Sequence, residues 1–244
     1  MKKSNDLNNI KKLFLDTLLK KGALRIAPSL NELFTFKSGR KSPNFINMGA
    51  LTDGESLGVI KIAYATMTVS ILNEKKIPDF EFVFGPAYKG INLACLTCEG
   101  LHELFGLNKR YLYDRKEEKD YADKKMDQVI VGAGYFKQGD RILLVDDVIT
   151  TGGTKVEMLE KLDVLGNHEV VGMVIAVDRQ EKMGDSVKVE ELSAIESIEK
   201  NFGIKTFPIL NMQEMFSLVK NELKSEIKKS WTEYYEKYGA VKLS

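Results

Sequence analysis

The stretch that decides the fold reads Ile142-Leu143-Leu144-Val145-Asp146-Asp147-Val148-Ile149-Thr150-Thr151-Gly152-Gly153-Thr154. It opens on a continuous apolar run, as in a strand of a parallel sheet whose two faces are both covered. We expect a strand over 141–145, a loop over 146–153 and a helix over 154–165 that Gly166 ends. Ligands of open α/β sheets bind at the carboxyl ends of strands, so the acids that follow this strand mark a candidate site.

The residues after this strand fit a phosphorylated sugar. Gly152 and Gly153 let the main chain approach an anion, and the N-terminus of the following helix adds a positive dipole end. Asp146 and Asp147 have the wrong charge for a phosphate, but they suit ribose hydroxyls or a magnesium ion. A helix cap explains one such residue, but not two adjacent acids followed by Thr-Thr-Gly-Gly-Thr.

The rest of the chain alternates between apparent strands and helices, which indicates a parallel α/β sheet. Further strands are expected at 80–84, 110–113, 129–133 and 170–177, with a helix over 90–105. Apolar residues at spacings of three and four predict helices near 7–18 and 57–71, and short strands are expected within 31–48. The same spacing over 216–231 predicts a C-terminal helix packed on the body.

Length and composition indicate one domain with decorated ends. The chain has 244 residues and a net charge of +1, so a whole-protein basic field for nucleic acid is absent. No run of about 18 apolar residues and no signal peptide is present, so we expect a cytoplasmic protein without a membrane partner. The two cysteines, Cys95 and Cys98, form a single CxxC, which we interpret as structural thiols of a buried helix in a reducing compartment.

Three other protein classes fit the sequence poorly. The absence of a Gly-Lys-Ser/Thr segment excludes a P-loop NTPase, and the absence of GxGxxG weakens a dinucleotide-binding interpretation. A receiver-domain acid pocket would place its acids on the first strand, whereas about 140 residues precede Asp146.

The 142–154 stretch resembles the phosphoribosyl pyrophosphate (PRPP) signature of type I phosphoribosyltransferases. Four further segments, in order, resemble orotate phosphoribosyltransferases: 36–45, 84–91, 114–121 and 177–181. The resemblance runs from about Leu13 to Asn211. It implies an α/β type I phosphoribosyltransferase fold, with a central, mostly parallel sheet flanked by helices and a small N-terminal hood. The implied segments are 1–50 (helix and hood), 51–205 (core) and 206–244 (helical tail packed on the core).

The resemblance implies a reaction that joins orotate to PRPP, giving orotidine 5'-monophosphate and pyrophosphate in de novo pyrimidine (UMP) biosynthesis. It implies catalytic roles for Lys119, Asp146 and Asp147. It places these residues at PRPP: Lys37, Tyr88, Lys89, Arg115, Lys116, Lys119, Tyr121, Asp146, Asp147, Val148, Ile149, Thr150, Thr151, Gly152, Gly153 and Thr154. It places these at orotate: Phe45, Ile46, Thr150 and Arg179.

The implied cofactor is Mg²⁺, held mainly through PRPP and water with no direct protein ligand. The implied assembly is a homodimer in which the 114–127 loop acts in the neighbouring subunit's site. The residue types agree, because pyrophosphate needs clustered cations and the planar orotate carboxylate needs an apolar face and hydrogen-bond donors. Alone, each of these residues has a plainer interpretation: Lys37 as a solvated lysine, Phe45 as core and Arg179 as part of a surface ion pair.

The sequence departs from the family pattern in three places. Tyr121-Ala122-Asp123 stands where the family commonly has His and glycines, and Phe45-Ile46 stands where it has an aromatic pair. Residues 27–31 look inserted. Two alternatives stay open: a phosphoribosyltransferase for another base, most plausibly a purine, and a PRPP-sensing regulator that is not an enzyme.

Overall fold

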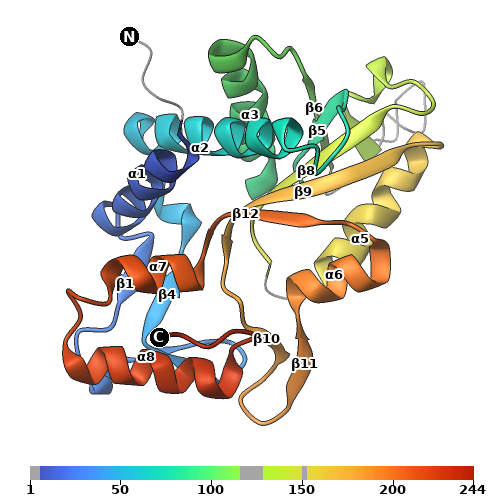
Figure 1. Cartoon of the computed structure of the whole chain (residues 1–244). Helices are drawn as coiled ribbons and strands as arrows, with labels where there is room; N and C mark the ends of the chain where they lie inside the picture. Colours follow the sequence, from blue (N-terminus) through green and yellow to red (C-terminus); the bar gives the residue numbers. More distant parts are fainter. Residues whose placement is uncertain (1–5, 116–128, 150–152) are drawn as a thin grey trace.

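The computed structural model describes residues 6–115, 129–149 and 153–244, without the side chains of 153–157 (Figure 1). The helices are α1 (Leu7–Lys20), α2 (Gly54–Asn73), α3 (Lys89–Phe105), α5 (Gly153–Leu162), α6 (Ala194–Phe202), α7 (Met212–Val219) and α8 (Ser225–Tyr238). The strands of the central sheet are β5 (Phe82–Phe84), β6 (Arg110–Asp114), β7 (Ile130–Val131), β8 (Arg141–Val148), β9 (Glu169–Asp178) and β12 (Thr206–Asn211). The short peripheral strands are β1 (Leu24–Ile26), β2 (Phe34–Thr35), β3 (Lys41–Ser42), β4 (Asn44–Ile46), β10 (Lys182–Gly184) and β11 (Val189–Ser193).

The central sheet has the strand order β12-β9-β8-β5-β6-β7. All neighbours pair in parallel except β6 and β7, which are antiparallel. The expected α/β class and the mostly parallel sheet are therefore confirmed. β8, the strand predicted from the apolar run, lies between β9 and β5, where both of its edges are hydrogen-bonded.

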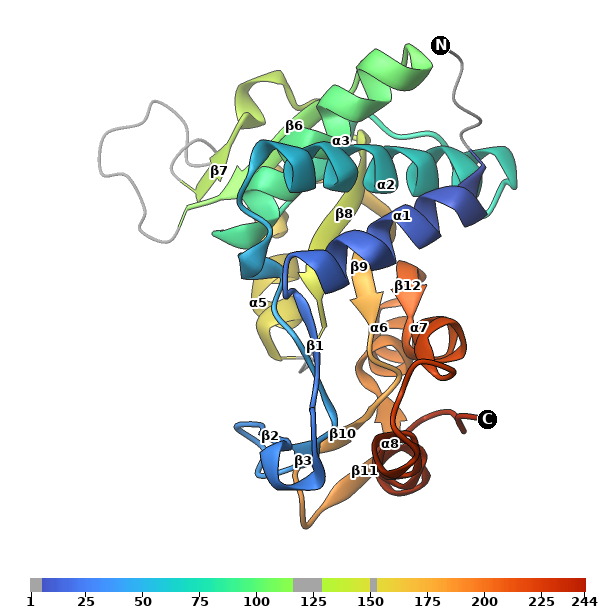
Figure 2. The same cartoon turned by 90° about the vertical axis from the view of Figure 1, so that its left-hand side faces the viewer.

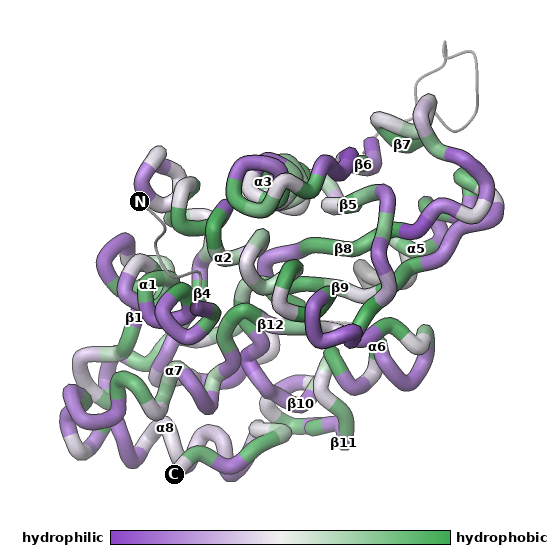
Figure 3. Tube along the Cα trace, turned by 45° about the horizontal axis from the view of Figure 1, so that its top comes forward, coloured by the Kyte–Doolittle hydropathy of each residue, from purple (hydrophilic) through white to green (hydrophobic). Residues whose placement is uncertain are grey.

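Alternate residues of β8 enter two different hydrophobic cores. Leu143 and Val145 pack with the cluster formed by α1, α2 and α3, whereas Ile142 and Leu144 pack with the cluster formed by α5 and α6. Figure 2 shows these helices on opposite sides of the sheet, and Figure 3 shows the hydrophobic strands inside more polar surroundings. This burial on both faces explains why the strand is apolar without alternation.

β8 is longer than the sequence predicted. Asp146 and Asp147 were expected in a loop, but they lie within the strand, where Asp146 pairs with Ile175 and Val148 with Val177. The expectation was wrong because the neighbouring β9 extends to Asp178, so backbone pairing continues after the apolar residues end. Both acids are consequently held by a sheet rather than by a loop.

The N-terminal segment forms two small antiparallel pairs, β1 with β4 and β2 with β3. Arg40, only 3% exposed, joins this hood to the β10–β11 hairpin. Its guanidinium donates to the carbonyls of Lys182 (2.8 Å), Met183 (3.0 Å) and Asp185 (3.1 Å). A buried arginine with three backbone acceptors fixes the position of the hood relative to the end of β9.

The C-terminal segment contains a strand and two helices. Residues 206–211, assigned above to a helical tail, form the edge strand β12. The single helix expected over 216–231 is divided into α7 and α8, because the apolar spacing of three and four continues across the turn that separates them. Whether the three implied segments act as separate units stays a prediction.

Two further observations concern the cysteines of α3 and the apolar helix α2. Cys95 and Cys98 are free thiols on α3, with Cys98 buried, and burial raises the pKa of its thiol to about 12. α2 is long and apolar enough to cross a bilayer, but half of it is buried in the fold, and it packs against α1 and α3. It has the features of a core helix.

Trp231 provides a test of how firmly the C-terminal helices belong to the core. Trp231→Ala is expected to lower the free energy of unfolding by about 3–5 kcal/mol, because the fully buried indole packs edge-on against Phe216 at 5.4 Å. Trp231→Phe should cost less, since the indole N–H has no partner among the described residues. Denaturant titration measures both.

The exposed Val187→Ala is the control and should stay within about 0.5 kcal/mol of the parent. A loss below about 1 kcal/mol for Trp231→Ala would contradict a shared core.

Candidate active site

The two acids of β8 project to opposite faces of the sheet, because successive side chains of a strand alternate. Asp147 follows the parity of Leu143 and Val145, so it lies on the face of α2 and α3, where it is only 7% exposed. Its carboxylate accepts from the backbone N–H of Val148 at 2.7 Å. Asp146 accepts from the N–H of Asp147 at 2.8 Å. Each carboxylate therefore uses part of its acceptor capacity on the strand itself.

Lys89 supplies the counter-charge to Asp147. Its Nζ lies 2.8 Å from Asp147 Oδ2, and its side chain is 61% exposed. Lys89 is the first residue of α3, and the neighbouring Tyr88 is 72% exposed. The structure thus brings the second motif, as predicted, beside the acids of the strand.

The turn that carries Tyr88 and Lys89 depends on two glycines. Any Cβ at Gly85 would meet the carbonyl group of Gly90, and any Cβ at Gly90 would meet Pro86 and Gly85. Backbone this closely packed leaves space only for hydrogen. The turn also contains a cis peptide bond between Ala87 and Tyr88.

Asp114 holds the same turn from the other side. This buried carboxylate, at the end of β6, accepts from the N–H of Ala87 at 2.5 Å and pairs with Lys161 of α5 at 2.5 Å. Lys161 also donates to the carbonyl of Arg115 at 3.2 Å. The start of the third motif is therefore tied both to the second motif and to α5.

Tyr64 of α2 is hydrogen-bonded to the end of β8. This fully buried side chain of α2 donates to the backbone carbonyl of Asp146 at 2.7 Å. Burial, together with the negative charges of Asp147 and Asp146, raises the pKa of Tyr64 well above its usual value. The hydroxyl therefore stays protonated and remains a donor to this carbonyl.

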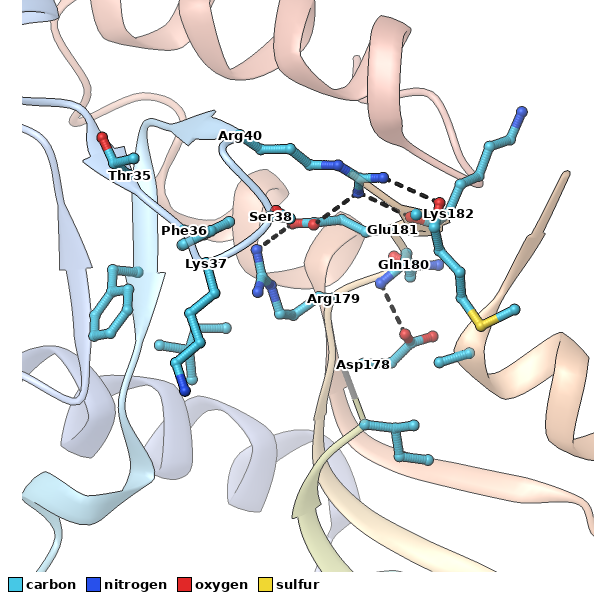
Figure 4. Close-up of a pocket in the computed structure, with 16 residues that line it drawn as sticks. Thr35, Phe36, Lys37, Ser38, Arg40, Asp178, Arg179, Gln180, Glu181 and Lys182 are labelled. Carbon is cyan, nitrogen blue, oxygen red and sulfur yellow. Dashed lines mark hydrogen bonds and ion pairs between the residues drawn. The ribbon is translucent and has the colours of Figure 1, made fainter. Parts of the chain in front are cut away.

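A cavity of about 540 Å³ lies between the hood and the end of β9 (Figure 4). Five predicted site residues line it: Lys37, Phe45, Ile46, Ile149 and Arg179. Lys37 comes from the hood, and Figure 4 shows it across from the 178–182 segment. The remaining lining includes Phe36, whose ring lies 6.2 Å from that of Phe45. The cavity thus combines an aromatic wall with four cationic side chains, Lys37, Arg40, Arg179 and Lys182.

Arg179 is oriented in this cavity by Glu181 and Phe36. Its Nη2 lies 2.5 Å from Glu181 Oε1, and its guanidinium carbon lies 4.2 Å from the centre of the Phe36 ring. Burial alone would lower the pKa of Arg179, but the attraction of Glu181 outweighs it and the pKa is raised. Its Nε is buried without a partner among the described residues. The guanidinium thus keeps its positive charge at the wall of the cavity, which suits an anionic ligand.

The sequence missed several residues that build this site. Arg40 and Glu181 stand inside the quoted motifs, yet nothing in the local pattern shows that they meet through the 3.6 Å contact of Nη1 and Oε2. Tyr64 looked like one member of an apolar helix stripe. Arg179, interpretable as a partner of Asp178, is paired with Glu181 instead. A signal for Asp114 was present, since it opens the third motif.

Part of the predicted site lies outside the described residues. These are Lys116, Lys119, Tyr121, Thr150, Thr151 and Gly152. Gly153 and Thr154 begin α5, so the backbone of the proposed phosphate cradle enters a helix N-terminus as expected. Val148 is the last residue of β8, and Arg115 directly follows β6.

Among the described residues, no group of three or more His, Cys, Asp or Glu side chains is arranged to hold a metal ion. Mg²⁺ commonly keeps several waters and binds through one or two carboxylates together with substrate phosphates. Asp146 and Asp147 provide two carboxylates at the end of β8. This donor set fits an ion brought in with a phosphorylated substrate and does not fit a protein-only cage.

Comparisons with known proteins agree along nearly the whole chain. The orotate phosphoribosyltransferase of Bifidobacterium adolescentis is 39% identical over 236 residues, covering 93% of this chain and 96% of that protein. That of Kluyveromyces lactis is 35% identical over 239 residues, covering 96% and 97%. The crystal structure of orotate phosphoribosyltransferase from Francisella tularensis matches with a TM-score of 0.75 at 30% identity, covering 93% of this chain and 99% of that one. No protein-family model matches the chain.

Two glycines in helices make a matched test of the turn geometry. Gly90→Ala should lower the free energy of unfolding by about 1–3 kcal/mol through overpacking, since its Cβ would lie 2.7 Å from the carbonyl carbon of Gly85. Gly58→Ala in α2 meets nothing within 4 Å, so it should raise stability by about 0.5–1 kcal/mol. Denaturant titration compares them. Equal stabilisation by both substitutions would show that the turn is not tightly packed.

Proposed function

Since the chain belongs to the orotate phosphoribosyltransferase family, we propose that the cavity at Arg179 holds orotate while the end of β8 holds PRPP. The enzyme is a pentosyltransferase that joins orotate to PRPP, and its fold is that of the type I phosphoribosyltransferases. One observation carries the assignment of the site: a single cavity collects Lys37, Phe45, Ile46 and Arg179 from two distant parts of the chain.

Orotate is a planar anion, and the cavity matches both properties. Phe45 and Ile46 offer an apolar wall for the ring, partly aliphatic where the family commonly has two aromatics. The guanidinium of Arg179, at the wall of the cavity, offers positive charge and N–H donors to a carboxylate or carbonyl oxygen. Lys37 lies on the opposite side of the cavity, and the family resemblance places it at PRPP. Thr150, adjoining the lining residue Ile149, is placed by family resemblance near both substrates.

PRPP fits along the end of β8. Asp146 and Asp147 accept hydrogen bonds from the ribose hydroxyls, and the backbone N–H groups from Thr150 to Thr154 receive the 5'-phosphate at the start of α5. Lys89 pairs with Asp147 through one N–H, and two further N–H groups of its ammonium serve a pyrophosphate oxygen. The other groups for pyrophosphate are Tyr88, Arg115, Lys116, Lys119 and Tyr121.

The reaction breaks the bond between C1 of the ribose and pyrophosphate, and a ring nitrogen of orotate forms the new bond to C1 from the opposite face. The proton of that nitrogen is lost to water or to the departing pyrophosphate. Pyrophosphate is already a good leaving group, so the protein contributes positioning and stabilisation of charge. Lys119 neutralises the charge that develops on the departing pyrophosphate. Mg²⁺ bound with PRPP would add further positive charge to this half of the site.

The proposed assembly is a homodimer in the cytoplasm, in which the 114–127 loop completes the neighbouring subunit's site. The described base of this loop supports a positioned flap, because Asp114 and the carbonyl of Arg115 are anchored to Lys161. The loop carries charged residues of both signs, which suits a segment that closes over charged substrate.

The activity is tested by following orotate absorbance with PRPP and Mg²⁺, beside parallel reactions with hypoxanthine, adenine and uracil. Orotate should be consumed, with formation of its nucleotide and pyrophosphate, and the other bases should not react appreciably. Omitting Mg²⁺ or adding a chelator should stop the reaction. Consumption of a purine base instead of orotate would overturn the assignment.

Lys119→Ala should reduce kcat by about 100-fold or more with a modest effect on the KM for PRPP, because its charge acts mainly in the transition state. Lys124→Ala removes another lysine of the same loop and should leave kcat within about twofold, since it has no assigned contact. Steady-state kinetics compares the two variants. An unchanged kcat in Lys119→Ala would remove this lysine from the mechanism.

A further inference from the structure

We propose that the C-terminal helix α8 positions Arg179 for orotate, through Tyr234, Tyr235 and Glu181. This inference rests on the proposed role of Arg179 at the base, and it adds three positioning residues that do not contact the substrate. The reason is that the short segment after β9, residues 179–181, accepts hydrogen bonds from four groups of the C-terminal segment.

Three contacts hold the backbone of this segment. Tyr235, 1% exposed, donates its hydroxyl to the carbonyl of Arg179 at 2.5 Å. The N–H of Ala240, just beyond α8, donates to the carbonyl of Gln180 at 2.8 Å. Glu181 and Gly239 form an antiparallel bridge. Tyr235 and the residues just beyond α8 thus hydrogen-bond to the backbone that follows β9. These contacts restrict the position of the Arg179 Cα.

Gln180 shows why such support is needed. Its φ of 49° lies in the left-handed region, which is unfavourable for a residue with a Cβ. Such a conformation persists when its surroundings determine it from several sides. Here the side-chain carbonyl of Gln180 accepts from the N–H of Gln213 in α7 at 2.9 Å, and Asp178 accepts from the N–H of Gln180 at 2.7 Å.

The side chain of Arg179 is controlled through Glu181, whose side chain is 11% exposed. One carboxylate oxygen of Glu181 binds Arg179 Nη2 at 2.5 Å. The other accepts from the Tyr234 hydroxyl at 3.1 Å. It also lies 3.6 Å from Arg40 Nη1 (Figure 4). Tyr234 therefore orients the carboxylate that orients the guanidinium.

Burial determines which group donates in the contact between Tyr234 and Glu181. Burial raises the pKa of Tyr234, with the charge of Glu181 adding to the effect, so the hydroxyl remains a donor to the carboxylate. With Nη2 bound to Glu181 and one face against Phe36, the guanidinium of Arg179 is held in a fixed orientation at the wall of the cavity. Loss of the Tyr234 hydroxyl leaves Glu181 shared between two arginines without its third partner, and the orientation of the guanidinium relaxes.

Tyr234→Phe and Tyr235→Phe test this inference, with Tyr238→Phe as the matched control on the same helix. The hydroxyl of Tyr238 makes only a long 3.5 Å contact with the carbonyl of Ser186 and does not touch 179–181. Each of the first two variants should raise the KM for orotate by on the order of tenfold, with the KM for PRPP and the melting temperature little changed. Tyr238→Phe should leave both KM values unchanged.

A double-mutant cycle with Arg179→Gln separates a positioning role from general loosening. If Tyr234 acts through Arg179, Tyr234→Phe should have no further effect on the KM for orotate in the Arg179→Gln background. Independent, multiplying effects of the two substitutions would overturn the inference, as would normal orotate KM values in both tyrosine variants while Arg179→Gln raises it.

An Arg179→Gln variant with an unchanged KM for orotate would instead contradict the proposed base site itself. If Tyr235→Phe does not fold, Tyr234→Phe and Glu181→Gln carry the test, because Glu181→Gln removes the same link from the other side and should raise the KM for orotate similarly.

Discussion

The structure depends on the parallel pairing of β8 between β5 and β9. Both sides of β8 are hydrogen-bonded to neighbouring strands and both faces are covered, so Ile142 to Val145 must all be apolar. Polar side chains can follow only near the carboxyl end of the strand. Those side chains are Asp146 and Asp147. The position of the site is therefore a consequence of how the core is built, and Tyr64 and Lys89 add the support and counter-charge that this position requires.

A second constraint concerns the base. β9 ends at Asp178, and beyond it the chain leaves the sheet with Arg179 inside a cavity whose other wall is the N-terminal hood. Arg40 holds the hood to this region, while α8 holds Arg179 through its backbone carbonyl and through Glu181. Chain ends that look peripheral in the sequence thus meet at the orotate side of the site, and the central sheet supplies the PRPP side.

Much of this arrangement could be predicted because it depends on local patterns in the sequence. Continuous apolar runs predicted the central strands, and ordered motifs predicted the cavity residues Lys37, Phe45 and Arg179. What failed depended on contacts between distant segments. The extension of β8 follows from its neighbour β9, the turn between α7 and α8 keeps the apolar spacing of one helix, and the pairing of Arg179 with Glu181 instead of Asp178 depends on the path taken after the strand.

The central claim is that one site divides into a sugar-phosphate half at the end of β8 and a base half at Arg179. A crystal structure of the enzyme with PRPP analogue and orotate bound tests it most directly. The account predicts ribose hydroxyls at Asp146 and Asp147, the 5'-phosphate at the start of α5, and the orotate ring between Phe45 and Arg179. Orotate density elsewhere, or a PRPP analogue that leaves the Asp146–Thr154 segment untouched, would contradict it.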